Sequence, residues 1–173
     1  MRSFALVPLA AALFGLSACG YHTLGAATHL PPNVRTLAVP VFATQTNNYH
    51  SEVVMTDAVI HELAARTSFR VEPKNDPEAD ATLHGTILRQ IVTPLTYNSS
   101  TQQSSSFLVT MLVSVKLTGR DGKVLYQNPR YVYRQQYQST TTLPTFLQED
   151  PAAVERLSRD FAQQLVADIL EGF

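Results

Sequence analysis

The only cysteine of the sequence, Cys19, lies directly after a short apolar segment near the N-terminus. Arg2 supplies a positive charge ahead of that segment. The segment itself, residues 4–15, is shorter than the roughly 20 residues that span a bilayer. The two small residues before the cysteine suit the cleft of a peptidase. This pattern predicts a leader, residues 1–18, that is cleaved immediately before the cysteine.

The four residues Leu16-Ser17-Ala18-Cys19 resemble the lipobox of bacterial lipoproteins. The resemblance implies that Cys19 is acylated on its sulfur and, after cleavage, on its new amine. Two or more acyl chains give stable membrane anchoring, whereas one chain gives only marginal binding. The following Gly20, in place of Asp, resembles the sorting pattern of outer-membrane lipoproteins. The alternative is an ordinary secretory signal followed by an unmodified cysteine.

The other residue types that support catalysis do not form a recognisable set. His61 and Glu62 begin like a zinc-protease helix, but Ala65 occupies the position of the second histidine. The remaining histidines lack the spacing of metal ligands. The sequence also lacks the serine-hydrolase elbow and the phosphate-binding loop. We therefore expect no enzyme activity, no metal site and no cofactor.

Composition indicates one domain that is held together by packing. Without the leader about 155 of the 173 residues remain, enough for a single core. The remaining chain has 12 Lys and Arg (13 less Arg2) against 14 Asp and Glu, a formal charge of −2. This balance argues against nucleic-acid binding, which needs clustered cations. With Cys19 acylated, no thiol is left for a disulfide.

Two segments have the spacing of amphipathic helices. In residues 51–66 the apolar stripe consists of Met55, Val59, Ile60 and Leu63. In residues 151–170, where Pro151 suits the first helical position, the stripe consists of Val154, Leu157, Phe161, Leu165 and Ile169. Each helix is therefore expected to bury one face, with Phe161 at the centre of the second stripe.

Four segments have strand patterns: residues 34–41, 81–92, 107–118 and 123–137. Residues 69–71 form a further, short extended piece. Pro40 predicts that the first strand ends there or lies at an edge, and Gly85 predicts a bulge or a close approach of another backbone. Asp121 and Gly122 predict a tight hairpin between the last two strands. The order of elements predicts an α+β two-layer sandwich, with both helices on one face of a mostly antiparallel four-stranded sheet. Residues 33–173 form the domain, and residues 19–32 form a lipidated tether.

Several separated stretches together resemble one known family. They are the Cys-Gly-Tyr-His start at residues 19–22, the strand at 34–41, the sequence Ala-Asp-Ala-Thr-Leu-His-Gly at 79–85, and residues 160–165 in the last helix. The chain resembles the lipopolysaccharide-assembly lipoproteins, LptE. The resemblance covers nearly the whole chain after the leader in element order. At residue level it rests on the start and the strand patterns.

The resemblance implies an outer-membrane lipoprotein that lies inside the lumen of a large β-barrel translocon of the LptD type. There it would plug the barrel, assist its assembly and contact lipopolysaccharide. Barrel lumens are polar, so the uncharged tract at residues 99–106 is a candidate contact. Within and beside it, Tyr97, Asn98 and Gln102 are the residues expected to meet the barrel.

One departure from the family concerns lipopolysaccharide. Its phosphates are proposed to meet basic residues in the loop between the first two long strands and before the last helix. Here residues 94–106 and 139–148 contain no Lys or Arg, so they supply no charge-assisted bonds to phosphate. The nearest matched cation is Arg134, for which a solvated strand charge is the ordinary explanation. Lipopolysaccharide binding is therefore expected to be weak or indirect.

Two other function classes stay open. The first half of the chain, residues 36–85, also resembles envelope lipoproteins of the curli-secretion and penicillin-binding-protein-activator type. Those proteins bind envelope machinery without this barrel, and the element order of the second half favours the barrel-associated family instead. A lipid-tethered periplasmic enzyme is the third class, and it lacks a catalytic set.

Overall fold

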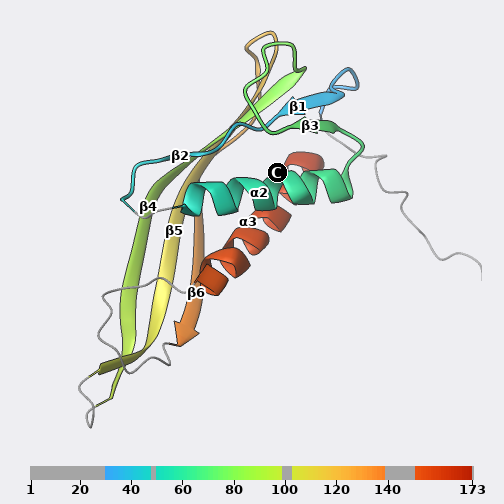
Figure 1. Cartoon of the computed structure of the whole chain (residues 1–173). Helices are drawn as coiled ribbons and strands as arrows, with labels where there is room; N and C mark the ends of the chain where they lie inside the picture. The colour runs from blue at the N-terminus through green and yellow to red at the C-terminus, as the bar shows by residue number, and fades with distance from the viewer. Residues whose placement is uncertain (1–29, 48–49, 99–102, 139–150, 173) are drawn as a thin grey trace, which may run out of the picture.

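The computed structural model describes residues 30–47, 50–98, 103–138 and 151–172. Within these ranges the chain forms six strands and two helices (Figure 1). The strands are β1 Thr36–Ala38, β2 Ala43–Thr44, β3 Arg70–Glu72, β4 Ala81–Asn98, β5 Gln103–Gly119 and β6 Val124–Gln138. The helices are α2 Ser51–Arg66 and α3 Pro151–Glu171. The predicted leader at residues 1–18, the predicted lipidation site Cys19 and the predicted contact Gln102 lie outside the described residues.

The predicted α+β class is confirmed, but the prediction of a mostly antiparallel four-stranded sheet is wrong. The sheet is mixed and six-stranded, in the order β3-β1-β4-β5-β6, with β2 paired to β4. β1 runs parallel to both β3 and β4, and β2 also runs parallel to β4. β2 has two residues, too few to show a period of two in the sequence. β3 has three residues and overlaps the short extended piece expected at residues 69–71.

The parallel part of the sheet follows from the helix between β1 and β3. A helical crossover returns the chain to the same end of the sheet, so the two strands that it joins run in the same direction. Pro40 lies beyond the end of β1 and lacks the N–H that a central strand would donate. β1 therefore ends before Pro40, as predicted, and it lies between two strands rather than at an edge.

The three long strands form an antiparallel meander that extends past the first turns of α3 (Figure 1). Gly122 has a positive φ of 81° in the turn between β5 and β6, which confirms the predicted hairpin. β4 continues six residues beyond the predicted end at Val92, and β5 begins at Gln103. Tyr97 and Asn98 are therefore strand residues, paired with Ser104 and Gln103.

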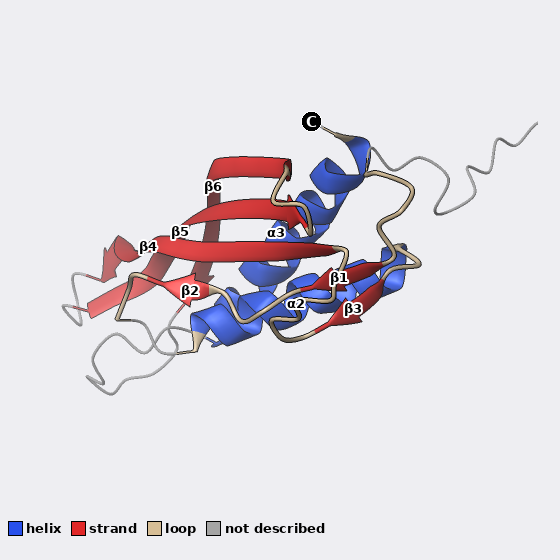
Figure 2. Ribbon diagram, turned by 90° about the horizontal axis from the view of Figure 1, so that it is seen from above, coloured by secondary structure: helices blue, strands red, loops and turns tan. Residues whose placement is uncertain are grey.

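Both helices cover the same face of the sheet, as predicted (Figure 2). The α3 stripe is fully confirmed, because all five of its predicted residues are buried. In α2, Met55, Val59 and Leu63 are buried, while Ile60 is half-buried. Leu30, within the segment predicted to be a tether, is also buried in the core.

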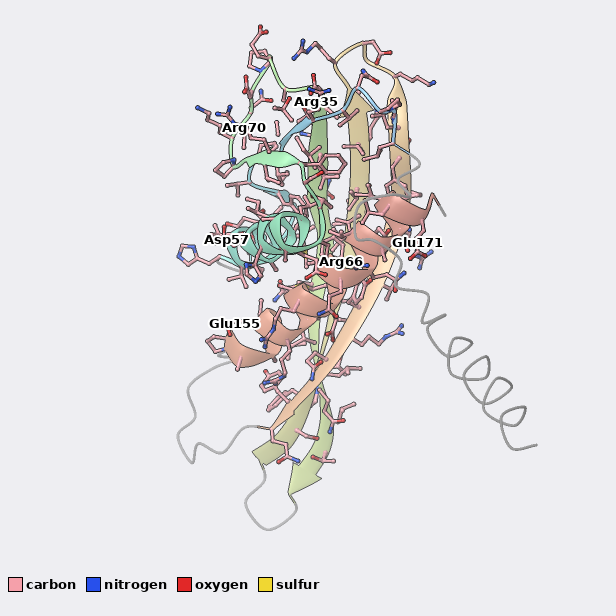
Figure 3. The ribbon with its side chains drawn as sticks, turned by 90° about the vertical axis from the view of Figure 1, so that its right-hand side faces the viewer. Arg35, Asp57, Arg66, Arg70, Glu155 and Glu171 are labelled. Carbon is pink, nitrogen blue, oxygen red and sulfur yellow. The ribbon has the colours of Figure 1, made fainter. Side chains whose placement is uncertain are left out.

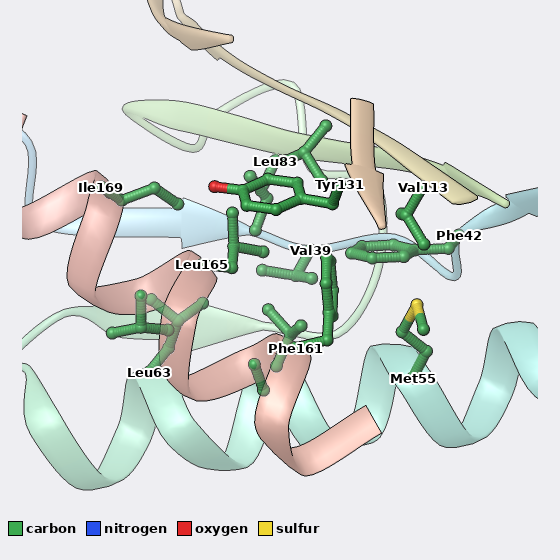
Figure 4. Packing of buried hydrophobic residues seen from close by; sticks show 14 of the residues in the cluster. Val39, Phe42, Met55, Leu63, Leu83, Val113, Tyr131, Phe161, Leu165 and Ile169 are labelled. Carbon is green, nitrogen blue, oxygen red and sulfur yellow. The ribbon is translucent and has the colours of Figure 1, made fainter. Parts of the chain in front are cut away.

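Phe161 occupies the centre of the core, as predicted, with no exposed surface (Figure 4). Its ring contacts Phe42, Tyr131 and Tyr133 edge-on, with centroids 6.3, 5.6 and 5.5 Å away. Such edge-to-face pairs add to the area that each ring buries. The helix α3 is therefore fixed to β6 and to the segment after β1 through one aromatic side chain.

Gly85 is explained by one of these rings. A Cβ atom at Gly85 would lie 2.4 Å from the Phe42 ring, closer than real contacts allow. The close neighbour is thus a side chain, and not the backbone that the sequence suggested. The bulge lies farther along β4, between Ile87 and Arg89.

Candidate functional site

The face of β4, β5 and β6 that points away from the helices is the candidate functional site, and we call it the outer sheet face. On β5 the residues that point toward the helices, such as Val109, Met111 and Val113, are completely buried. Their alternating neighbours point to the opposite side. In register across the three strands, this face carries three successive rows: Arg89, Leu112, Val132; Ile91, Thr110, Arg134; and Thr93, Leu108, Gln136.

The bulge in β4 decides which side chains reach this face. Before it, Leu83, Gly85 and Ile87 point toward the helices and are buried. Strict alternation would also turn Arg89 toward the helices. The extra residue at the bulge reverses the alternation. Arg89 is therefore exposed opposite Leu112, whereas Gln90 pairs with the buried Met111.

The three long strands carry positive charge without any compensating negative charge. β4, β5 and β6 contain Arg89, Lys116, Arg130 and Arg134, and no Asp or Glu. The register places Lys116 on the outer sheet face, between His84 and Gln127. Among the described residues, no salt bridge involves any of these four cations. The charged side chains of the outer sheet face are therefore all positive, and this face attracts anions.

The acidic side chains lie mainly in the other layer. Figure 3 shows Asp57 on α2, and Glu155 and Glu171 on α3, projecting from the helices. The two helices together contain seven Asp and Glu against three Arg. The molecule therefore has a net negative helical layer and a positive sheet layer.

Apolar side chains are interleaved with the cations on the outer sheet face. Ile91 is 43% exposed and Val132 is 40% exposed, although both are large and apolar. Leu108 and Leu112, on the central strand, are half-buried between their neighbours. A surface that combines arginines with apolar side chains can bind a molecule that has both anionic groups and hydrocarbon.

The predicted contact residues have different outcomes. Arg134 is exposed on the outer sheet face, opposite Thr110. Tyr97 and Asn98 lie at the far end of β4, at the end of the sheet opposite to the β5–β6 hairpin. Gln102 and Cys19 lie outside the described residues, so their roles stay predictions.

Sequence reasoning missed Arg89 and Lys116 as partners of Arg134. The signal was present in the sequence, because Asp121 is the only Asp or Glu between residues 81 and 148. A stretch of that length with six Lys and Arg and one acidic residue is a charge asymmetry. The charge asymmetry does not show that Arg89 and Arg134 lie on one face of the sheet, because the bulge in β4 decides where Arg89 points.

A second polar cluster joins β6 to the last turns of α3. Asp168 accepts a hydrogen bond of 2.5 Å from the Tyr131 hydroxyl and one of 2.6 Å from the Gln164 amide. The Tyr126 hydroxyl bonds to that of Tyr131 and lies 3.4 Å from Asp168. Burial, together with the bond to Asp168, raises the pKa of Tyr131 above its usual range. Tyr131 therefore stays a neutral donor at physiological pH, which suits a structural role.

Asp80 joins the beginnings of β1 and β4. Its Oδ2 accepts hydrogen bonds from the backbone N–H groups of Arg35 and Thr36, both at 2.9 Å, and from the Thr36 hydroxyl at 2.8 Å. These bonds, with a smaller contribution from Arg120 at 3.4 Å, lower the pKa of Asp80 to about 2. An open cleft of about 560 Å³ lies beside it, lined by residues including Asn33 and Lys123. Asp80 and Arg120, two of the charged residues that line this cleft, are paired with each other and hold the strands together.

The described residues contain no group of three or more His, Cys, Asp or Glu that could hold a metal ion. Within the same part of the chain, neither helix is both long enough and apolar enough to cross a membrane.

Solved structures with the same fold include lipoproteins of other bacteria. The uncharacterized lipoprotein B of Nitrosomonas europaea is 14% identical and superposes with a TM-score of 0.50, over 82% of this chain and 88% of that protein. A hypothetical protein of Chlamydia trachomatis is 13% identical, with a TM-score of 0.52 over 80% and 96% of the two chains. At such low identity these likenesses establish the fold alone. No curated protein matches the sequence.

A sequence model of the LptE family, whose description is lipopolysaccharide-assembly, matches residues 34–169. The matched range contains both helices up to the last turn of α3 and all six strands. This confirms the resemblance that the sequence suggested. Because the match covers well over half of the chain, the protein belongs to the LptE family of lipopolysaccharide-assembly lipoproteins.

Proposed function

We propose that this lipoprotein occupies the lumen of an LptD-type outer-membrane β-barrel, which it plugs and helps to assemble while lipopolysaccharide passes to the outer leaflet. The observation that supports this most strongly is the outer sheet face. It is not covered by either helix, it carries Arg89, Lys116 and Arg134 without any acidic residue, and its other side chains are hydroxyls and amides interleaved with apolar residues. A polar lumen offers hydrogen-bond partners to such a face.

The same face gives lipopolysaccharide a place to bind. Arg89 and Arg134 lie on the two strands that flank β5, in adjacent rows, so their Cα atoms are separated by roughly 10–12 Å. Guanidinium groups form paired hydrogen bonds with phosphate. The exposed Ile91 lies beside Arg89 on this face of β4, and the exposed Val132 lies beside Arg134 on β6, so both can contact acyl chains. These cations lie on the strands, whereas residues 94–106 and 139–148 contain no Lys or Arg.

Photo-crosslinking tests the docking site. Crosslinkers at Tyr97, Asn98 and Gln102 should capture a large outer-membrane barrel in intact envelopes. A crosslinker at Ala26, in the predicted tether, serves as the control and should capture less of it. Capture that is even over all four positions would remove the plug hypothesis. Capture of a peptidoglycan synthase instead would favour the activator-type alternative.

Lipopolysaccharide binding requires a separate measurement. The purified domain should bind lipopolysaccharide weakly, and the affinity should fall as salt rises, because the proposed contacts are exposed and ionic. The double variant Arg89→Gln/Arg134→Gln should lose most of this binding. The matched control Arg156→Gln/Arg159→Gln, which removes the same charge from α3, should bind as the wild type does. Equal loss in both pairs would show that net charge, and not this face, controls binding.

Membrane attachment depends on the predicted anchor. Cys19→Ala should abolish incorporation of labelled fatty acid and release the protein from the membrane fraction. The described core consists of residues from Leu30 onward, which the substitution leaves unchanged, so the variant domain should unfold at the same denaturant concentration as the wild-type domain. Incorporation of labelled fatty acid into the alanine variant would contradict the lipobox assignment.

A further inference from the structure

The extended part of the sheet has two edges, and they differ. In the described part of the chain, β6 is the last strand of the sheet and β5 is its one neighbour. On the other side, β2 pairs with β4 only at Thr86 and Ile87, so β4 is also an edge from the bulge onward. A strand with one neighbour directs about half of its N–H and C=O groups away from the sheet, where another strand can pair with them.

The edge formed by β4 carries the features that prevent such pairing. Its register is interrupted after Ile87, after Pro94 and after Thr96, and each irregularity twists the strand. Pro94 has no N–H to donate to a neighbour. Natural sheets use bulges and prolines in this way to keep other chains from adding to an edge.

On β6, the register shifts and Pro129 all precede Tyr131, and the rest of this edge lacks such features. Residues 131–138 pair one for one with residues 113–106 of β5, without a bulge. This stretch contains no proline, and Arg134 is its one charged residue. The Gln136 carbonyl accepts an exposed hydrogen bond of 3.2 Å from the side chain of the adjacent Gln135, a bond that a partner strand could replace. The regular edge is therefore ready to accept a strand.

We propose that β6 accepts an extended, acidic segment of the barrel partner as an additional strand of the sheet. The charge of the site favours acidic residues in that segment, because β6 presents Arg130 and Arg134 and no strand beside it has a carboxylate to offset them. Main-chain hydrogen bonds supply affinity in this mode of binding, and the side chains supply specificity.

A second copy of this chain is a less suitable occupant. If two β6 strands paired antiparallel with their outer faces on the same side, the registers that pair most of residues 131–138 would place the two Arg134 side chains directly opposite or diagonally across the new interface. Like charges in cross-strand positions are destabilising. A segment with Asp or Glu in that position converts the repulsion into attraction.

This inference rests on the proposed function, since it names the same partner. Crosslinking can test the strand addition at β6 separately from the plug hypothesis. Gln136 on β6 and Thr93 on β4 lie in one row of the outer sheet face, on either side of Leu108, and both are exposed. They form a matched pair, one at each edge. A photo-crosslinker at Gln136 should capture the barrel at least fivefold more than one at Thr93, and mass spectrometry should find a captured segment that contains Asp or Glu.

Each result has a definite meaning. Equal capture at the two positions, stronger capture at Thr93, a captured segment without acidic residues, or capture of a second copy of this chain would each overturn the inference. If Tyr97, Asn98 and Gln102 also fail to capture the barrel, the proposed function fails with it. If those three positions capture the barrel while Gln136 does not, the plug hypothesis stands and the strand addition is wrong.

Discussion

The two faces of the sheet are built from the same three strands, yet they have opposite chemistry. The inner face packs completely buried side chains, such as Met111 and Leu117, against the helices. The outer sheet face keeps large apolar residues 40% or more exposed beside arginines. Burial on one face supplies the stability of the domain, which leaves the composition of the other face free to serve binding. Substitutions on the inner face should therefore mainly lower stability, whereas substitutions on the outer sheet face should mainly weaken binding.

The largest effect is expected from Phe161 on the inner side. Phe161→Ala should lower the free energy of unfolding by about 3–5 kcal/mol, because it removes a fully buried ring that three other aromatic rings contact. Urea unfolding of the domain without residues 1–19 measures this. Val132→Ala on the outer sheet face is the control and should cost less than about 1 kcal/mol. Similar losses of unfolding free energy in the two variants would show that the two faces contribute equally to stability.

A smaller effect is expected at Gly85, where the inner face has no room. Gly85→Ala should cost about 1–3 kcal/mol, because the new methyl group must displace the Phe42 ring. Phe42→Leu makes space, so the double variant should lose less than the sum of the two single variants. Unfolding of all four proteins gives the coupling energy. Additive losses would show that Gly85 is required for some other reason.

The pH dependence of stability tests the strand ends, which belong to neither face. The folded-state pKa of Asp80 is about 2, below the unfolded value of 3.8, so its stabilising contribution is complete above the unfolded value. That contribution is lost as the pH falls toward 2. The stability advantage of the wild type over Asp80→Asn should therefore shrink over this interval in urea unfolding. An advantage that does not change with pH would mean that the bonds to Arg35 and Thr36 do not depend on the charge.

The smallest effect on stability is expected from the arginines of the outer sheet face. Arg89→Gln and Arg134→Gln should each change the free energy of unfolding by less than about 0.5 kcal/mol, because both residues are exposed and neither forms a salt bridge in the described structure. The thermal midpoint measures this readily. A clear loss of stability would make these residues part of the fold and would confound the binding experiment proposed for them.

The comparison of sequence and structure is clearest on β4. Its first half was predicted correctly, because Leu83 and Ile87 alternate with polar residues. Its second half follows a shifted alternation after the bulge, which turns Ile91 to the outside and continues as far as Asn98. Nothing local in the sequence marks the bulge, so the placement of Arg89 could not be predicted. The candidate site was therefore predicted in part, through Arg134 alone among its three cations.

The sequence by itself determined the elements whose signal is periodic or local. The stripes of α2 and α3, the alternation of β5 and the Asp-Gly turn each follow from the geometry of a single segment, so they can be read one at a time. Only the tertiary structure decided the parallel pairing of β1 with β3 and β4, the contact of Phe42 with Gly85, and the gathering of Arg89, Lys116 and Arg134 on one face. Those features depend on register and packing between segments distant in the chain, and strands of two or three residues are too short to specify either.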